Sequence, residues 1–535
     1  MKLNTKHLKS DLPSGLVVFL VALPLCLGIA SASGAPFFSG IISGIVGGIV
    51  IAALSNSALS VSGPAAGLAT LVAGAIMAIG DFRLFLCAVL IAGILQMLLG
   101  LAKLGGIANY IPGSVIKGML TSIGILIIAK QIPKAVGYDK DEQGNLTELF
   151  EYGHESMHEL LQPLRHIEVG VVIVCIVSII TMLVWDKPFF KKKLPYIPGA
   201  LVAVVVALLI NQVWLSTGSK LAIENEHLVK LPVASTPNEF FNFFSLPDFS
   251  GFLNGTVIVY GVVIALIASL ETLLSIEAID NIDPERRITN TNKELFAQGV
   301  GNTVAGLIGG LPVTSVIVRS SANVNAGAKT KMSAIIHGVL LLVSIVAIPG
   351  LLNKIPLSAL AAILLLTGYK LAKPAVFKGF WKAGKYQFVP FIVTVIVIIA
   401  IDLFSVVPVL SGKGLIIGVF AGIMAAAGAI LHGNLKNSYF FHREKHREGD
   451  TIRIRFSEEV SFLNKAAIRQ TLDHLPENST VVLDASSTKY IDYDVLEIVK
   501  EFRDIKAPLK KISLTLLGFK EAYKIDSDSF VQSGH

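Results

Sequence analysis

The sequence is poor in charge and in cysteine. Asp, Glu, Lys and Arg make up 16% of its 535 residues, whereas soluble proteins contain about 25% of them. Its three cysteines, Cys26, Cys87 and Cys175, each stand alone in an apolar run, a distribution that excludes a disulfide framework and a cysteine-based metal site. The apolar part also has no pattern of nucleophile, base and oxyanion donors. We therefore expect no catalytic residues, no cofactor and no enzyme.

Long apolar runs are abundant instead. Hydrophobic residues make up 53% of the chain, and runs such as GVVIALIASL and FIVTVIVIIAI recur from residue 13 to about residue 432. A helix that crosses a bilayer needs about 20 such residues. The sequence predicts an α-helical polytopic membrane protein. Its fourteen expected spans are 13–32, 36–55, 62–80, 83–101, 112–130, 166–185, 196–216, 255–277, 292–310, 314–328, 332–350, 356–372, 386–405 and 412–432.

Lysine and arginine are distributed unevenly between the loops. With fourteen spans, the basic clusters fall on one side, together with both termini. The clusters are Lys2, Lys6 and Lys9; Lys187, Lys191, Lys192 and Lys193; Arg286, Arg287 and Lys293; Lys329 and Lys331; and Lys370, Lys373, Lys378, Lys382 and Lys385. Because cytoplasmic loops are enriched in these residues, we expect both termini in the cytoplasm. The net charge of +7 then belongs to a membrane protein, and we expect no nucleic-acid partner.

The third segment of each half differs from an ordinary span. VSGPAAGLATLVAG and LPVTSVIVRSSANVNAG each begin with a polar stretch that carries a proline, Pro64 or Pro312. Unusual segments at matching positions of two halves indicate the central site of a transporter. Seven spans per half would also make the repeat an inverted one. Two broken helices that meet head to head would present free N–H groups and positive dipole ends to an anion. The alternative is a pair of tilted packing helices.

Two charged residues lie inside apolar segments. Glu271 and Ser275 are four residues apart and share one helix face, which suits a sodium ion or a carboxylate that exchanges a proton. The alternative for Glu271 is a buried, hydrogen-bonded packing role. Arg319 is interpreted as setting the electrostatics of an anion site. Its alternatives are an ion pair with Glu271 and a side chain that reaches one membrane surface.

The composition changes at about residue 445. GDTIRIRFSEEVSFLN predicts two short strands, KAAIRQTLDHL an amphipathic helix, TVVLDAS a buried strand, DVLEIVKEFRDI a second helix and KKISLTLLG another strand. Alternating strands and helices indicate a small α/β domain. We expect a transmembrane domain at residues 1–435, a basic linker at 436–448 near anionic headgroups, and a cytoplasmic α/β domain at 449–535.

Several stretches together resemble one family. DLPSGLVVFLVALPLCLGIASASG, SVSGPAAG, SLETLLSIEAID and GNTVAGLIGGLPVTSVIVRSSANVNAGAKT are similar, in order, to the sulfate permease (SulP) anion transporters. TVVLDASSTKYIDYDVLEIV resembles a STAS domain, the usual cytoplasmic partner in that family. The resemblance implies a fourteen-span 7+7 inverted repeat, a core domain that moves against a gate domain, a homodimer, and a bacterial inner-membrane location.

The resemblance also implies a site. Its anion-binding positions are Ala65, Ala66, Ile317, Val318 and Arg319 at the two helix starts, with Leu25 and Ile29 of the first span opposite. Its cation-coupling positions are Glu271 and Ser275, where a sodium-coupled bicarbonate-transporting member has Asp and Thr, and the nearby Thr314 and Ser315. Leu25 and Val318 replace polar residues of some animal members, so backbone N–H groups must supply more of the contacts. Asp492 is followed by Tyr493, not by the phosphorylatable serine of related STAS proteins.

These features predict a secondary active transporter that works by alternating access. We expect a small inorganic anion, bicarbonate first and sulfate second, in symport with sodium or protons. A sulfate, chloride or dicarboxylate transporter or exchanger is the alternative within this class. The alternative of another class is a non-transporting membrane anchor that presents a STAS sensor or scaffold domain.

Overall fold

The fold is that of a computed structural model, which describes residues 7–106, 111–138, 167–194, 197–234, 236–403, 414–434 and 451–519. A helix lies on each of the apolar ranges expected to span a membrane. In the described part of the chain, eight helices are long and apolar enough to cross a bilayer. The expected linker at 436–448 lies outside the described residues.

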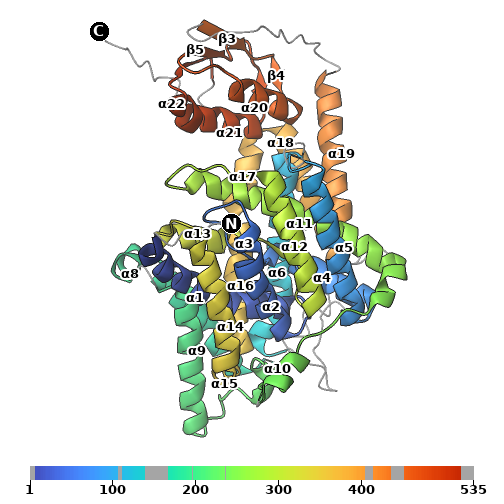
Figure 1. The fold of residues 1–535 in the computed structure, drawn as a ribbon, viewed down its shortest axis with the longest axis vertical. Helices are drawn as coiled ribbons and strands as arrows, with labels where there is room; N and C mark the ends of the chain where they lie inside the picture. Colours follow the sequence, from blue (N-terminus) through green and yellow to red (C-terminus); the bar gives the residue numbers. More distant parts are fainter. Residues whose placement is uncertain are drawn as a thin grey trace. The chain divides into compact units, whose positions relative to one another are not determined.

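The first half of the membrane region begins at the N-terminus (Figure 1). Its helices are α1 (Leu8–Ala32), α2 (Phe37–Val46), η2 (Gly47–Ile51), α3 (Ala52–Leu54), α4 (Ala66–Ile79), α5 (Phe82–Leu101), α6 (Gly113–Val136), α7 (Val169–Trp185), α8 (Pro188–Lys193) and α9 (Gly199–Ser216). The connection that follows holds η5 (Asn225–His227), α10 (Pro237–Asn242) and η6 (Phe249–Leu253).

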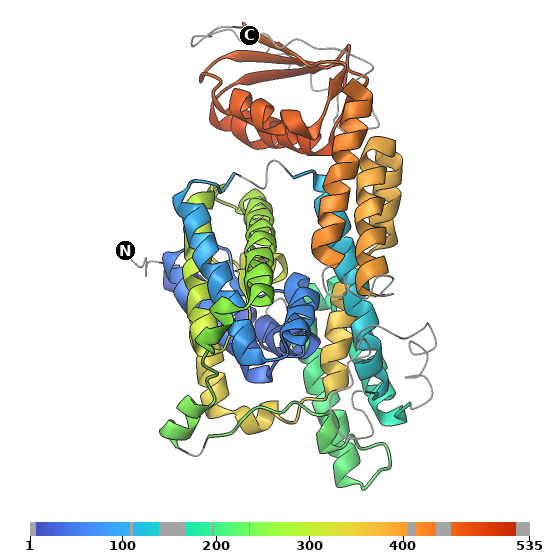
Figure 2. The same ribbon diagram turned by 90° about the vertical axis from the view of Figure 1, so that its right-hand side faces the viewer.

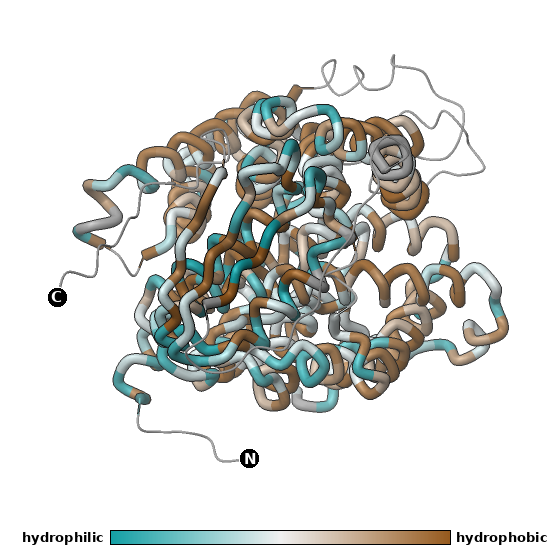
Figure 3. Tube along the Cα trace, turned by 90° about the horizontal axis from the view of Figure 1, so that it is seen from above, coloured by the Kyte–Doolittle hydropathy of each residue, from teal (hydrophilic) through white to brown (hydrophobic). Residues whose placement is uncertain are grey.

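The second half of the membrane region begins at α11. Its helices are α11 (Gly255–Ile282), α12 (Thr291–Ile308), α13 (Ile317–Asn325), α14 (Met332–Ala347), α15 (Pro349–Leu352), α16 (Leu357–Leu371), α17 (Pro374–Ala383), α18 (Lys385–Asp402) and α19 (Gly414–Asn434). Most helical turns are hydrophobic, drawn brown in Figure 3. The helix α17 was missed, because its ten residues lie in a lysine-rich stretch with no long apolar run.

The two odd segments are broken helices. Each begins with a three-residue strand, β1 (Ser62–Pro64) or β2 (Val313–Ser315), and only then becomes helical as α4 or α13. The strands pair antiparallel, with Gly63 opposite Thr314, and all six residues are buried. Backbone of this kind is tolerated at membrane depth only where protein surrounds it or where it lines a cavity.

Close helix packing surrounds this strand pair. The helix α12 packs along α5, and α11 packs against α5 and β2; α5, α11 and α12 are neighbours in Figure 1. Small residues allow the approach of α5 to α12. A Cβ placed on Gly93 would lie 2.5 Å from the backbone nitrogen of Thr303, and one on Gly299 would lie 2.5 Å from that of Met97. Small residues at helix interfaces are typical of membrane proteins.

The C-terminal region is a small α/β domain. Strands β3 (Thr451–Arg455), β5 (Thr480–Asp484) and β7 (Ser513–Leu517) form a parallel sheet in the order β3-β5-β7. Strands β4 (Glu459–Val460) and β6 (Tyr490–Ile491) form a second pair. The other elements are η8 (Phe462–Asn464), α20 (Lys465–Asp473), α21 (Tyr493–Glu501), η9 (Phe502–Lys506) and α22 (Ala507–Leu509). The helices lie on one face of the sheet (Figure 2).

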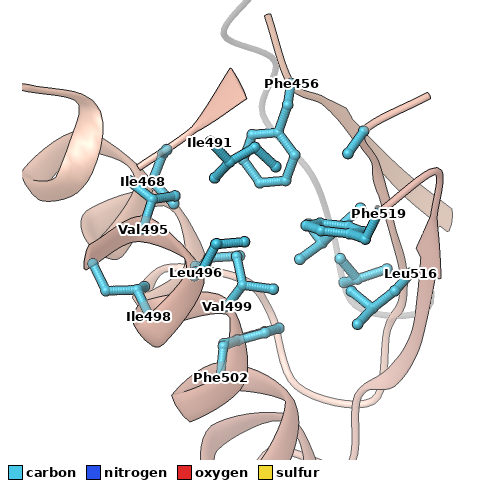
Figure 4. Close-up of a cluster of buried hydrophobic side chains, with 14 of the residues drawn as sticks. Phe456, Ile468, Ile491, Val495, Leu496, Ile498, Val499, Phe502, Leu516 and Phe519 are labelled. Carbon is cyan, nitrogen blue, oxygen red and sulfur yellow. The ribbon is translucent and has the colours of Figure 1, made fainter. Parts of the chain in front are cut away.

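The core of this domain lies between sheet and helices. Val495, Leu496 and Val499 of α21 point toward Phe456 and Phe519, which follow β3 and β7 (Figure 4). From the strands, Ile452, Val481, Leu483 and Leu516 are buried in the same cluster. This arrangement confirms the expected order of strands and helices after residue 445.

By its contacts the chain divides into two compact units. The first holds Met1–Gly106, Leu120–Lys373 and Val397–Ile417. The second holds Ile107–Met119, Pro374–Ile396 and Gly418–His535. The second unit therefore includes the α/β domain, all of α17, the start of α6, the larger part of α18 and most of α19. Within it, Asp494 of α21 accepts a hydrogen bond from the Gly113 N–H at the start of α6, at 2.8 Å.

Candidate functional site

The strand pair brings two helix starts to one place. Ser62 lies opposite Ser315 and Pro64 opposite Val313, and each helix begins two residues after its strand ends. The cap residues are Ala65 for α4 and Val316 for α13, both extended and neither with a side chain that caps the helix. The first N–H groups of a helix have no partner inside it. Both starts therefore offer free donors and a positive dipole end, as an anion requires.

The side chains around the helix starts are small or apolar. Ala65 is buried and Ala66 half-buried, whereas Ile317 and Val318 expose 42% and 52% of their surface. Leu25 and Ile29 are buried on one face of α1, and α1 packs against α4, α13 and β1. The structure therefore places the expected anion-binding residues on the elements that meet at the strand pair. Few of them carry a polar side chain.

The side chain of Arg319 lies against β1 inside the protein and does not reach a membrane surface. Its side chain is fully buried, and the guanidinium Nη2 lies 3.4 Å from the Pro64 carbonyl oxygen. The thiol of Cys26 is beside it, and a Cβ on Gly63 would collide with the guanidinium. The interpretation of Arg319 as a cation that reaches the surface is wrong, because the β1–β2 pair covers it.

Among the described residues, the charge of Arg319 forms no ion pair. Its Nε and Nη1 atoms have no hydrogen-bond partner among the residues that the structure describes. Among those residues no carboxylate forms an ion pair with it within 4.0 Å, so the expected alternative of a pair with Glu271 is wrong. A buried charge without a partner is costly. An anion bound at the helix starts would lie close enough to offset it.

Glu271 lies at the first turn of α4. A Cβ on Gly67, the second residue of that helix, would lie 2.7 Å from the carboxylate oxygen Oε1 of Glu271. A carboxylate is stabilised at a helix start by the N–H groups and the dipole. Ser275 is buried one turn further along α11. Glu271 therefore connects α11 to the same helix start that the anion would use.

The hydroxyl groups of the β2 residues Thr314 and Ser315 differ in their hydrogen bonding. The Thr314 hydroxyl is buried and has no partner among the described residues, so it is free to serve as a ligand. The Ser315 hydroxyl lies 2.6 Å from that of Ser60, and the Ser315 N–H donates to the hydroxyl of Thr272 on α11 at 3.3 Å. Carboxylate and hydroxyl oxygens suit a hard cation such as sodium. No group of three or more metal-ligating side chains occurs within the described ranges.

Sequence reasoning missed the residues that hold the strands. Gln298 of α12 donates to the Ser62 hydroxyl at 2.7 Å, and Asn302 of the same helix bonds to the Val313 backbone. Both are fully buried. The available signal was the spacing of Glu294, Gln298 and Asn302, four residues apart, which puts three polar groups on one face of an apolar helix.

Comparison with known proteins gives a consistent result. A model described as the sulfate permease family matches residues 8–394. YvdB of Bacillus subtilis (strain 168), named for sulfate transport, is 29% identical over 377 residues, which cover 69% of this chain and 66% of that protein. The bicarbonate transporter BicA of Synechocystis is 25% identical over 392 residues, or 72% of this chain and 64% of that protein. The chain thus spans slightly less than two thirds of both relatives.

Longer matches and solved structures agree with this. The chloroplastic sulfate transporter 4.1 of Arabidopsis thaliana is 24% identical, with 96% of this chain and 77% of that protein covered. The transmembrane domain of a cyanobacterial BicA is similar at a TM-score of 0.60 and 23% identity, covering 80% of this chain and 99% of that one. A structure titled SLC26A9 is similar at a TM-score of 0.67 and 15% identity, covering 98% and 87%. At these identities the likeness to the structures shows the fold, that of a helical polytopic membrane protein.

Proposed function

Because this chain belongs to the sulfate permease family and is an inorganic anion transporter, not an enzyme, we propose that it carries a small oxyanion together with a coupling cation. The observation that carries this proposal is the pair of uncapped helix starts held by β1 and β2. A membrane anchor needs no such arrangement. The unpaired, buried guanidinium of Arg319 behind the strands supports an anionic substrate.

Bicarbonate is proposed as the first substrate and sulfate as the second. Side-chain donors are scarce at the helix starts, where Ala65, Ala66 and Val318 stand. A doubly charged tetrahedral ion gives up far more hydration than a singly charged planar ion and needs more donors in return. One buried arginine charge, that of Arg319, matches the single charge of bicarbonate. The charge of Arg319 would also offset part of the double charge of sulfate, and sulfate is therefore proposed as the second substrate.

Glu271 is proposed to bind the coupling cation. Its carboxylate lies at the start of α4, Ser275 lies one turn further along α11, and the hydroxyl of Thr314 is free of other hydrogen bonds within the described part of the chain. These oxygens suit sodium, and a proton on Glu271 is the second choice. Either ion would reduce the negative charge next to the anion. Cation binding would therefore favour anion binding at the neighbouring helix start.

The transport cycle is proposed to be alternating access. In this view fourteen spans form a 7+7 inverted repeat, with the strand pair in a core domain that moves against a gate domain. The basic loops support a cytoplasmic location for both termini and for the α/β domain, which is consistent with a STAS domain. A homodimer in a bacterial inner membrane completes the proposal.

Purified full-length protein in liposomes tests this function. Uptake of radiolabelled bicarbonate and sulfate should be measured on the same vesicles, with and without sodium and pH gradients. We expect bicarbonate uptake that one of the gradients accelerates. Sulfate uptake without any bicarbonate uptake would overturn the substrate ranking, and exchange without dependence on either gradient would overturn coupling. Absence of uptake for every small anion would favour the alternative of a membrane-anchored STAS scaffold.

A further inference from the structure

The helix α12 carries a line of buried polar side chains toward the strand pair. Glu294, Gln298 and Asn302 are each fully buried and are spaced four residues apart on one face. Glu294 accepts from the Ser55 hydroxyl at 2.5 Å and from Gln298 at 3.0 Å. Each residue of the line bonds to a segment outside α12, and Asn302 is the one nearest to β2.

Asn302 acts as an additional strand partner for β2. Its Oδ1 accepts from the Val313 N–H at 2.6 Å, and its Nδ2 donates to the Val313 carbonyl at 3.0 Å. The side-chain amide thus satisfies both backbone groups of the first residue of β2. The strand leads within two residues to Val316 and the start of α13. The position of this helix start therefore depends on Asn302.

A second amide extends the contact to the helix of Glu271. Asn302 Nδ2 also donates to Gln96 Oε1 of α5 at 2.6 Å, and Gln96 Nε2 donates to the Ser269 hydroxyl of α11 at 3.3 Å. Gln96 and Ser269 are both buried. Ser269 and Thr272 share one face of α11, and Thr272 accepts from the Ser315 N–H. The helix α11 is thus linked to both ends of β2: directly to Ser315, and through Gln96 and Asn302 to Val313.

We propose that Gln96 and Asn302 are positioning residues that make anion affinity at the α13 start depend on the state of α11. The inference rests on the proposed function, because it assigns the proposed coupling between cation binding and anion binding to a path of contacts between the two sites. A cation bound at Glu271 or Ser275 holds α11 in place. Thr272 then fixes the position of β2 directly, and Ser269 does so through Gln96 and Asn302. In turn, β2 fixes the position of the N–H groups at the start of α13. Coupling of this kind requires a continuous set of contacts that both sites influence.

The test measures the KM for bicarbonate and for sulfate in proteoliposomes at low and high sodium, and at pH 6 and 8. The ratio of KM values between the two cation conditions is the readout, because a general loss of stability changes the rate but not this ratio. Gln96→Leu leaves both bonds between Asn302 and Val313 in place, as well as the bond between Thr272 and Ser315, and removes the link from Asn302 through Gln96 to Ser269 of α11. We expect the ratio to fall about fivefold toward one, the effect of one buried hydrogen bond.

Ser269→Ala breaks the same link from its other end. We expect it to lower the ratio as Gln96→Leu does, and the double variant to be no worse than either, as for two residues in one interaction. Asn302→Asp keeps the acceptor for the Val313 N–H but loses both donated bonds. It should raise the anion KM at every cation concentration. Thr303→Val is the matched control, because in the described part of the chain its hydroxyl bonds only within α12, to the Gly299 carbonyl.

The outcomes separate the inference from the function beneath it. A wild type that responds to a cation, together with a Gln96→Leu variant that responds equally, would overturn the inference alone. Additive effects of Gln96→Leu and Ser269→Ala would do the same, as would an equal change in Thr303→Val. A wild type that transports anion but responds to neither sodium nor pH would overturn the coupling in the proposed function, and this inference with it.

Discussion

At the scale of single residues, Glu271 is the side chain whose replacement separates coupling from folding. Its carboxylate lies at the start of α4, and no ion pair of Glu271 exists among the described residues. Glu271→Ala should therefore abolish gradient-driven uptake and leave the protein folded. Uptake in proteoliposomes with an imposed sodium or pH gradient measures the first, and thermal unfolding of the purified protein measures the second.

The control for this variant is Glu477→Ala, which removes an exposed acidic residue from the α/β domain. It should transport as the wild type does. If Glu271→Ala transports at the wild-type rate with unchanged ion dependence, Glu271 has no role in coupling. A buried packing role, the alternative raised by the sequence, would show as a lower unfolding temperature with intact ion dependence.

Asp492 predicts a pH dependence in the second unit. Burial, and next the neighbouring Asp494, raise the pKa of Asp492 to about 6, although Gln387, Lys465 and the Asp494 N–H favour its ionised form. Because the folded-state pKa lies above the usual value of about 4, the stabilisation from this group is complete below about pH 4 and is lost as the pH rises through 6. The second unit should be less stable at pH 7.5 than at pH 5.5.

Asp492→Asn tests the direction of this pH dependence of stability. The amide oxygen can still cap α21 by accepting from the Asp494 N–H, and the amide nitrogen can donate to Gln387 once the Gln387 amide turns its oxygen toward it. The residue no longer ionises. The variant should unfold at a higher temperature than the wild type at pH 7.5, by a few degrees, and the difference should shrink at pH 5.5. Thermal unfolding of the full-length protein at both pH values measures it. A variant less stable than the wild type at pH 7.5 would show that the charge is favourable there.

At the scale of elements, the start of α4 leaves no room beside Gly67. A methyl group there would lie 2.7 Å from Oε1 of Glu271, and overfilling a packed site costs about 1–3 kcal/mol. Gly67→Ala should displace the carboxylate and lower the apparent cation affinity by roughly tenfold, the equivalent of 1.4 kcal/mol. Sodium or proton titration of uptake measures this. Gly428→Ala adds a methyl to α19 with no atom within 4 Å and should have no effect.

The elements also show what the sequence could and could not predict. Run length and lysine distribution were enough to place a helix on each expected range, because a bilayer demands long apolar helices. Pro64 and the run of Ser and Thr in β2 indicated the broken helices. The contact between Asn302 and Gln96 was not predictable, because the two residues are 206 positions apart and only tertiary packing brings them together. The same holds for the burial of Arg319 behind β1.

At the scale of the whole molecule, the α/β domain and the proposed transport site belong to different units. All the residues around β1 and β2 lie in the first unit, whereas the α/β domain lies in the second. Deleting residues 445–535 should therefore leave a protein that inserts in the membrane and binds anion, with a reduced transport rate. Stabilisation of the truncated protein against heat by bicarbonate or sulfate measures binding. A truncated protein that inserts but gains no stability from either anion would contradict this independence.

A point variant tests one of the contacts that the deletion removes. Asp494 accepts from the first N–H of α6, so Asp494→Ala takes away a helix cap, which is worth about 1 kcal/mol, together with the ion pair to Lys465 inside the α/β domain. It should lower the transport rate in the same direction as the deletion and leave the anion KM unchanged. Glu477→Ala again serves as the control. An increase in KM without a change in rate would place the effect of the domain on binding.

The strand pair also constrains how the protein is made. Ser60 and Ser315, whose hydroxyls meet beside the strands, are 255 residues apart. At a synthesis rate of about 5–20 residues per second, the backbone of β1 waits roughly 13–50 seconds for its partner to leave the ribosome. Until then the N–H and carbonyl groups of β1 lack the strand partner that they have in the complete protein. The N-terminal half alone therefore lacks the strand that pairs with β1, and we expect this half to be degraded by membrane proteases faster than the full-length protein when translation stops early.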